Sequence, residues 1–196
     1  MSNAKCTKVL APVPYFSQWE SRDLTGDVLS KGAEVALARD PRWASSGAGT
    51  LGEYVTWGAH VCGMACLKMT LAARTGRIIP TLELARECTA NGGYVVDVNT
   101  GRIQGLIYAP FVRFVRERFG VDSEVITGTT AERMPQLFDH AEFFLASVHP
   151  SIRWRIGSHR REAGIRCWSC SALPAVWYFT IRPAMIRHHS NMPDWT

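Results

Sequence analysis

The chain has 196 residues, of which 46% are hydrophobic, and it carries a net charge of +5. This composition is sufficient for one domain with a sizeable core and excludes a mainly disordered chain. No run of about 18 apolar residues occurs, so we expect no membrane-spanning segment. Residues 1–6 lack the apolar core of a signal peptide, from which we expect a cytoplasmic location and reduced cysteines.

The positive charge is concentrated near the end of the sequence. Residues 155–196 contain six arginines and no lysine, against Glu162 and Asp194, which gives this segment a net charge of +4. The preceding residues carry 16 basic and 15 acidic side chains. Because this larger part is nearly neutral, we expect no nucleic-acid-binding surface on the folded body.

The first part of the chain is poor in regular patterns. Residues 13–18, Val-Pro-Tyr-Phe-Ser-Gln, form an extended segment because proline fixes the backbone. Residues 19–56 form a long insertion, with one predicted helix at 32–38 and a Gly/Ser-rich loop at 45–49. Its aromatic side chains could line a substrate cleft, although packing against a core is the commoner use of tryptophan. These residues are Trp19, Trp43 and, just after the insertion, Trp57.

Cys62 stands where an irregular stretch gives way to a helix. The apolar spacing predicts that this helix runs from Gly63 to Arg74 and stops at residues 75–76. A thiol at that junction faces unpaired N–H groups and the positive end of the helix dipole, which both favour the nucleophilic thiolate. A buried, inert thiol is the alternative interpretation of Cys62, and we expect Cys66 to be a small core residue.

Further elements follow in the order helices first, strands later. We predict a helix at 81–91, capped by Thr81 and ended by Asn91 and two glycines, and a second helix with Pro110 in its first turn, ending at Gly120. The intervening Gly-bearing loop, 92–105, includes a short predicted strand at 94–96. The remaining predictions are strands at 123–127 and 143–148 and a capping box at 129–132.

Two motifs in this order, Val-Pro-Tyr-x-x-Gln at 13–18 and Cys-Gly-Met-Ala-Cys at 62–66, resemble the papain-like cysteine peptidases of the bacteriocin-processing type. The resemblance extends over residues 10–153 and includes Gly-Leu-Ile-Tyr at 105–108. Carried over by position, Cys62 is the nucleophile and Gln18 donates to the oxyanion of the tetrahedral intermediate.

The resemblance also implies the architecture and the partner. It implies an α+β papain-like fold whose helical N-terminal half places the nucleophile at a helix N-terminus, and whose C-terminal antiparallel sheet is incomplete here. The peptidase domain would occupy residues 1–154, truncated, and residues 155–196 would be a basic, irregular tail. The implied partner is a peptide or protein substrate, and no cofactor is expected.

The general base that a cysteine nucleophile needs is missing from its expected place. The family carries Gly-Gly-His at the start of a strand and an Asn or Asp on the next strand, and neither motif follows Trp154. His60 is too close in sequence to Cys62 for the family geometry, and His140 is expected to be exposed. His149 is the one remaining candidate in the body, although a surface or packing role is commoner for such a residue.

A frameshift would explain this loss. With permitted codons, residues 164–169 can be regrouped in a neighbouring frame to encode His-Pro-Val-Leu-Val, and the residues before them to supply Gly-Gly. In the same frame, residues 176–184 can encode Val-Val-Leu-His-Asn-Pro-Ser-Gly. We therefore predict a single-nucleotide frameshift near Trp154, which leaves 155–196 out of frame and the enzyme impaired.

Two other classes of function remain open. The chain could be a non-catalytic peptide-binding module that keeps the cleft without the chemistry. Alternatively, residues Cys167-Trp-Ser-Cys170 with His159, His188 and His189 could hold a structural zinc in a basic domain. The zinc signal is weak because no second paired motif accompanies it.

Overall fold

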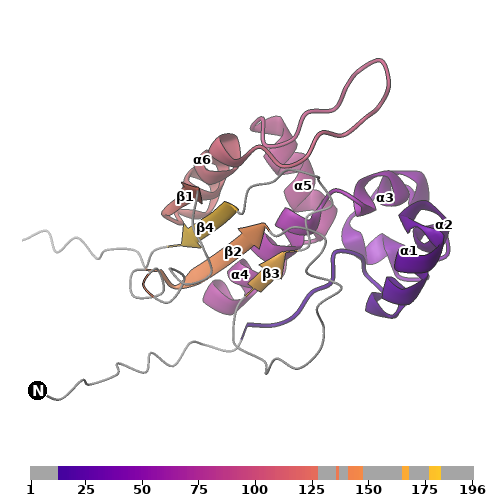
Figure 1. Cartoon of the computed structure of the whole chain (residues 1–196), viewed down its shortest axis with the longest axis horizontal. Coiled ribbons are helices and arrows are strands. Elements are labelled where there is room, and N and C mark those ends of the chain that lie inside the picture. The colour runs from indigo at the N-terminus through magenta and orange to yellow at the C-terminus, as the bar shows by residue number, and fades with distance from the viewer. Residues whose placement is uncertain (1–12, 128–135, 137–140, 148–164, 168–176, 182–196) are drawn as a thin grey trace, which may run out of the picture.

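The computed structural model describes residues 13–127, 136, 141–147, 165–167 and 177–181. These residues form α-helices, short 3-10 helices and four strands (Figure 1). The helical elements are η1 (Arg22–Leu24), α1 (Thr25–Lys31), α2 (Ala33–Leu37), η2 (Trp43–Ser46), α3 (Leu51–Gly58), α4 (Cys62–Thr75), α5 (Thr81–Ala90) and α6 (Tyr108–Phe119). The strands are β1 (Ser123–Thr127), β2 (Phe143–Ser147), β3 (Ile165–Cys167) and β4 (Trp177–Ile181).

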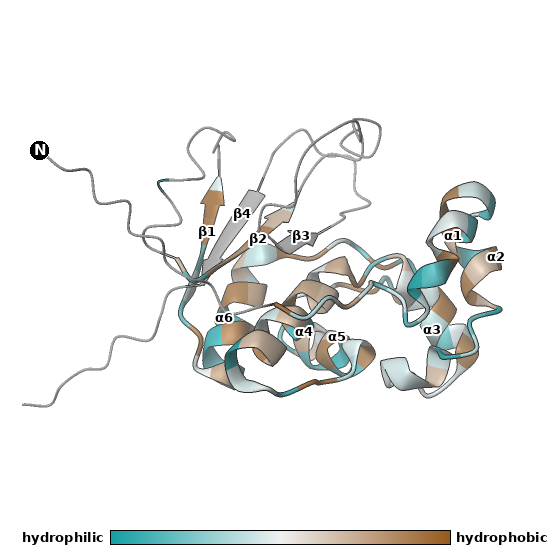
Figure 2. Ribbon diagram, turned by 90° about the horizontal axis from the view of Figure 1, so that it is seen from below, coloured by the Kyte–Doolittle hydropathy of each residue, from teal (hydrophilic) through white to brown (hydrophobic). Residues whose placement is uncertain are grey.

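A four-stranded sheet packs on a layer of helices. The strand order is β1-β4-β2-β3, and α4, α5 and α6 lie on the same side of this sheet (Figure 2). The shorter helices α1, α2 and α3 form a separate group beside α4 and α5 (Figure 1). Helices thus precede strands along the chain, which agrees with the α+β class predicted from the sequence.

The sheet differs from the predicted antiparallel arrangement. β4 is antiparallel to both β1 and β2, whereas β3 is parallel to β2, with Leu145 opposite Ile165. Parallel neighbours need a crossover connection of about a dozen or more residues, and positions 148–164 separate β2 from β3 in the sequence. The prediction that 155–196 is irregular is also wrong at β3 and β4, because both segments pair with β2.

Helix α4 is the centre of the helical layer. All nine residues from Gly63 to Leu71 are buried, so the helix is covered on every side, as expected for a central core helix. Its apolar members pack into one cluster with residues of α5, α6 and β2. The helix ends at Gly76, which adopts the left-handed conformation with φ 72°, as the Thr75-Gly76 stop signal predicted.

The boundaries of the later elements follow the sequence closely, with one exception. Helix α6 includes Pro110 in its first turn and ends before Gly120, and β1 and β2 coincide with the predicted strands to within one residue. Thr81 does not cap α5, because Pro80 is the N-cap and the Thr81 hydroxyl instead accepts a hydrogen bond from Lys68. The predicted capping box at 129–132 lies outside the described residues.

The loop at 92–105 carries less strand than predicted. Val96 forms one isolated antiparallel bridge with Ile103, in place of a strand at 94–96. The Asp97 carboxylate closes the turn between them by accepting hydrogen bonds from the N–H groups of Asn99 and Thr100. The Asp97 side chain thus provides an acceptor for two backbone N–H groups of the turn.

The insertion at 19–56 is more ordered than its sequence indicated. Besides the helix predicted near residue 35, it forms α1 and most of α3, together with both 3-10 helices. Helix α3 begins with a capping box that we did not predict: the Thr50 hydroxyl accepts from the Glu53 N–H at 3.1 Å. The Glu53 carboxylate in turn accepts from the Gly49 N–H, one residue before the usual partner.

Candidate catalytic site

Cys62 is the first residue of α4, as the sequence predicted to within one position. Its N-cap, Val61, makes no side-chain capping hydrogen bond. The Cys62 side chain is partly exposed and packs against the edge of the core. Cys62 as a residue is therefore not fully buried, whereas Cys66 is only 1% exposed, as expected for a small core residue.

Gln18 is held at the connection that leads into Cys62. Its side-chain Nε2 donates to the backbone oxygen of Gly58 at 2.7 Å. Gly58 is the last residue of α3, and only residues 59–61 separate it from Cys62. An amide NH2 group has two donors, so this contact leaves the second Gln18 N–H for another acceptor.

The position of Gly58 leaves no room for a side chain. A Cβ built there would collide with Cδ1 of Leu37, a fully buried residue of α2. The close contact fixes the last turn of α3 against α2, and with it the carbonyl group that Gln18 uses. A larger residue at position 58 would thus force the Leu37 side chain to shift.

A buried polar network anchors the segment that carries Gln18. Asp40, which is 2% exposed, accepts hydrogen bonds from the Ser21 hydroxyl at 2.6 Å, the Ser21 N–H at 3.1 Å and the Tyr54 hydroxyl. The Tyr54 oxygen accepts from the Glu20 N–H at 2.9 Å. Glu20 and Ser21, which follow closely after the extended segment 13–18, are therefore fastened to later residues of the insertion, one through Tyr54 of α3 and one through Asp40.

The titration of this network follows from its contacts. Burial alone would raise the pKa of Asp40, but hydrogen bonds from Ser21, Tyr54 and the Arg42 N–H outweigh burial and lower it. The pKa of Tyr54 is raised, first by burial and then by its hydrogen bond to Asp40. At neutral pH the network therefore consists of a carboxylate and a phenol that donates to it.

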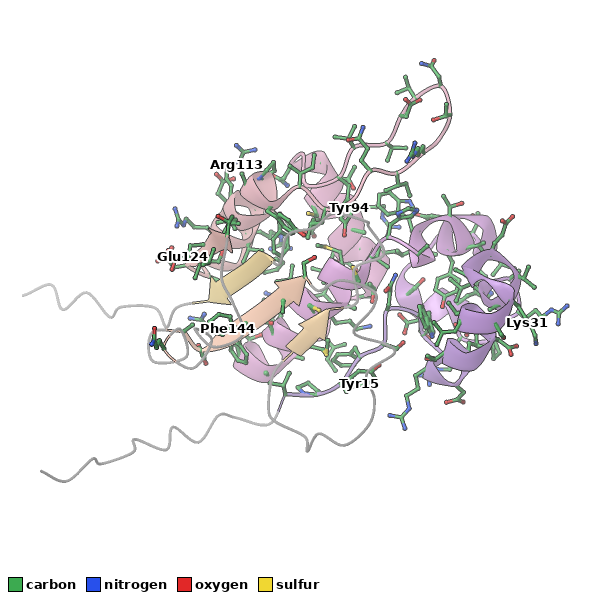
Figure 3. The ribbon with its side chains drawn as sticks, viewed as in Figure 1. Tyr15, Lys31, Tyr94, Arg113, Glu124 and Phe144 are labelled. Atoms are coloured by element: carbon green, nitrogen blue, oxygen red, sulfur yellow. The ribbon has the colours of Figure 1, made fainter. Side chains whose placement is uncertain are left out.

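His60 lies in the connection between α3 and α4, two residues before Cys62. Burial lowers the pKa of its imidazole, so the neutral form dominates at neutral pH. Its backbone oxygen accepts from the Tyr94 hydroxyl at 3.2 Å, which ties the connection to the loop after α5 (Figure 3). The other candidate bases, His140 and His149, lie outside the described residues.

The residue after Cys62 contacts the third stretch of the family resemblance. A Cβ at Gly63 would lie 2.6 Å from Cδ2 of Leu106, so the backbone of α4 approaches that side chain closely. Leu106 belongs to the Gly-Leu-Ile-Tyr stretch at 105–108, which leads into α6. The structure thus places Leu106 of the third stretch against the N-terminal end of α4, whereas the hydrogen bond of Gln18 ends at Gly58, four residues before Cys62.

The three tryptophans of the first half pack against the core, which is the commoner of the two roles that the sequence allowed. Trp19, Trp43 and Trp57 are partly buried against the hydrophobic core. Trp57 stacks edge-to-face on Tyr94, with ring centroids 5.5 Å apart. Trp19 also lines a cavity.

The predicted zinc ligands are largely outside the described part of the chain, and of Cys167 the structure describes only the backbone of β3. Among the described residues, no group of three or more His, Cys, Asp or Glu side chains is placed to hold a metal ion. The described residues therefore give no support to the zinc alternative.

Sequence reasoning missed two parts of this site. The Asp40 network joins residues up to 34 positions apart, and no local motif marks such a contact. The start of α3 did carry a signal, because Thr50-Leu-Gly-Glu53 is a capping-box sequence.

Comparisons with known proteins found no relative of this chain. No family model matches the chain, and neither the curated proteins nor the solved structures contain a match to it. Within the described ranges, no helix is long and apolar enough to cross a membrane.

Proposed function

We propose that this chain has the design of a papain-like cysteine peptidase or amidase whose catalytic set is incomplete as written. The observation that carries the proposal is the 2.7 Å hydrogen bond from Gln18 to Gly58, at the turn that leads directly into Cys62. It supports the pairing of an oxyanion donor with a nucleophile that the two sequence motifs imply.

In the proposed reaction, the Cys62 thiolate attacks the carbonyl carbon of a peptide or amide substrate. The second N–H of Gln18 and the backbone N–H of Cys62 would donate to the oxygen as it becomes negative. The Cys62 N–H suits this role because N–H groups of the first helical turn have no partner within the helix. The leaving amine needs a proton, which the family histidine would supply.

The two described strands of the tail fall where the shifted frame would encode the family motifs. β3 begins at Ile165, where the shifted frame would encode the family histidine at the start of a strand. β4 covers 177–181, where the same frame would encode the strand that ends in His-Asn-Pro. The described strands therefore occupy the positions at which a restored chain would carry its base and the residue that orients it.

Restoring the reading frame tests the proposal. We expect hydrolysis of a fluorogenic peptide library to rise by about 10³-fold or more in the frame-restored chain, because loss of a catalytic base costs several orders of magnitude. Replacing Cys62 in the restored chain by serine (Cys62→Ser) should abolish the gain, and Cys66→Ser should retain it. Equal activity in the written and restored chains would contradict the proposal, and so would a gene with no Gly-Gly-His in any frame.

Alkylation of Cys62 separates the peptidase from a peptide-binding module that lacks the chemistry. We expect iodoacetamide to modify Cys62 in the folded chain with a half-maximal rate below about pH 8.5, the range of an ordinary thiol. Peptide mass spectrometry assigns the modified residue. Cys88 is the internal control, because burial raises its pKa to about 12 and it should react only after unfolding. A Cys62 profile centred at or above pH 8.5 favours the binding module.

A further inference from the structure

A cavity of about 470 Å³ lies beside the segment that carries Gln18. Its size is in the range of small-molecule sites. Neither Gln18 nor Cys62 is among the residues that form its wall, so it is a separate feature from the proposed catalytic pair. The wall comprises Tyr15, Phe16, Ser17, Trp19, Glu20, Ser21, Arg22, Asp23, Arg42, Ser45, Lys68 and Ile78.

Lys68 is an unusual member of this wall. It lies on the buried helix α4 and is only 5% exposed. Its ammonium group donates to the Thr81 hydroxyl at 3.4 Å and lies 3.7 Å from the Glu20 carboxylate and 4.8 Å from the centre of the Phe16 ring. A buried cation is stable only when it is well paired, and these are long contacts for a group with three donors.

With Lys68 counted, the formal charges of the wall do not balance. Arg22 and Arg42 join Lys68, whereas the acidic side chains are Glu20 and Asp23, so the wall has a net formal charge of +1. Aromatic rings of Tyr15, Phe16 and Trp19 form the apolar part of the same wall. The complement of such a surface is a ligand with one negative charge and an apolar body.

We propose that this cavity binds a small monocarboxylate with an apolar or aromatic body, whose carboxylate pairs with Lys68. The bound carboxylate would give the buried ammonium a closer partner than the described residues supply. A dianion such as sulfate fits less well, because its second charge would face Glu20 and Asp23. This inference does not depend on the proposed peptidase chemistry, since neither Cys62 nor Gln18 takes part.

Binding can be measured with benzoate as the probe, benzamide as its uncharged isostere and sulfate as a dianion. The readout is the indole N–H signal of Trp19 in a two-dimensional ¹H–¹⁵N NMR spectrum, assigned by its loss in Trp19→Phe. We expect a saturable shift with benzoate, and affinity at least about tenfold weaker for benzamide, as expected for loss of a charge-assisted contact. The absence of a saturable shift, or equal affinity for benzamide or sulfate, would overturn the proposal.

Two variants of opposite expected sign test the role of Lys68. Lys68→Met removes the cation and should weaken benzoate binding by about tenfold or more. Glu20→Gln removes the competing carboxylate and should strengthen it, while the Glu20 backbone N–H keeps its bond to Tyr54. Lys31→Met is the matched control, because Lys31 projects from the outer side of α1, paired with Asp27 at 3.0 Å (Figure 3).

Together, these variants keep the proposal testable even if one of them does not fold. If Lys68→Met fails to fold, Glu20→Gln decides the matter, and unchanged or weaker binding in that variant contradicts the proposal. A loss in Lys31→Met as large as that in Lys68→Met would show a general charge effect and would likewise overturn it.

Discussion

At the scale of single residues, Asp40 organises the surroundings of Gln18. It is buried, yet it accepts hydrogen bonds from Ser21, Tyr54 and the Arg42 N–H, so its carboxylate has several donors. A buried carboxylate is tolerated only under such conditions. Because the contacts favour the charged form, the state of Asp40 links the stability of this region to pH.

We expect Asp40→Asn to lower the free energy of unfolding by about 2 kcal/mol at neutral pH, the range for hydrogen bonds to a charged group. The folded-state pKa of Asp40 is lowered, so the charged form contributes its full stability above the unfolded value, near 3.9. That contribution is lost as the pH falls through the folded-state pKa. The difference between wild type and variant should therefore shrink below about pH 3.9.

Urea unfolding at a series of pH values measures this difference. Asp27→Asn is the control, because Asp27 is exposed on α1 and pairs only with Lys31 at 3.0 Å. A difference between wild type and Asp40→Asn that stays constant down to pH 2 would contradict the assigned role of Asp40.

At the scale of elements, α3 connects the two parts of the candidate site. Its first turn is capped by Thr50, and its last residue, Gly58, accepts the hydrogen bond from Gln18. Tyr54 in the middle of the helix joins the Asp40 network. A substitution at Thr50 should therefore affect the hydrogen bond between Gln18 and Gly58, although Thr50 and Gly58 lie at opposite ends of α3.

We expect Thr50→Ala to destabilise the chain by about 1 kcal/mol, the usual cost of losing an N-cap side chain. Thr56→Ala on the same helix is the matched control, since the Thr56 hydroxyl donates only to the Gly52 backbone oxygen at 2.9 Å. Urea unfolding measures both. Hydrogen exchange at the α3 amides should become faster in Thr50→Ala alone, and equal effects of the two substitutions would contradict the capping role.

At the scale of the whole molecule, β4 holds the sheet together. It pairs with β1 on one side and with β2 on the other, so β1 and β2 have no direct contact in the strand order. The four residues Phe143–Ala146 of β2 are buried. A chain without 155–196 would leave this apolar strand with two open edges, a condition that favours aggregation.

We expect a chain that ends at Trp154 to unfold at lower urea concentration than the full chain, because it loses both partners of β2. The backbone amides of 143–147 should also exchange faster with solvent. The control is α5, whose amides should keep their protection if the helical layer survives. Unchanged exchange in 143–147 would show that the segments at 165–167 and 177–181 do not pair with β2 in solution.

The sequence by itself determined the elements whose signals are local. The positions of α4, α6, β1 and β2, and of Cys62 at a helix start, follow from apolar spacing, glycine stops and proline placement within a few residues of each element. The capping box at Thr50 was equally local and could have been found the same way. Such features depend on the backbone geometry of one segment, which neighbouring residues are sufficient to specify.

Only the tertiary structure decided which distant groups meet. The contact of Gln18 with Gly58 spans 40 positions, and the pairing of Lys68 with Glu20 spans 48. The parallel pairing of β3 with β2 likewise joins residues 20 positions apart, such as Leu145 and Ile165. These contacts depend on how the whole core packs and on which charged groups it buries. A local stretch of sequence specifies neither.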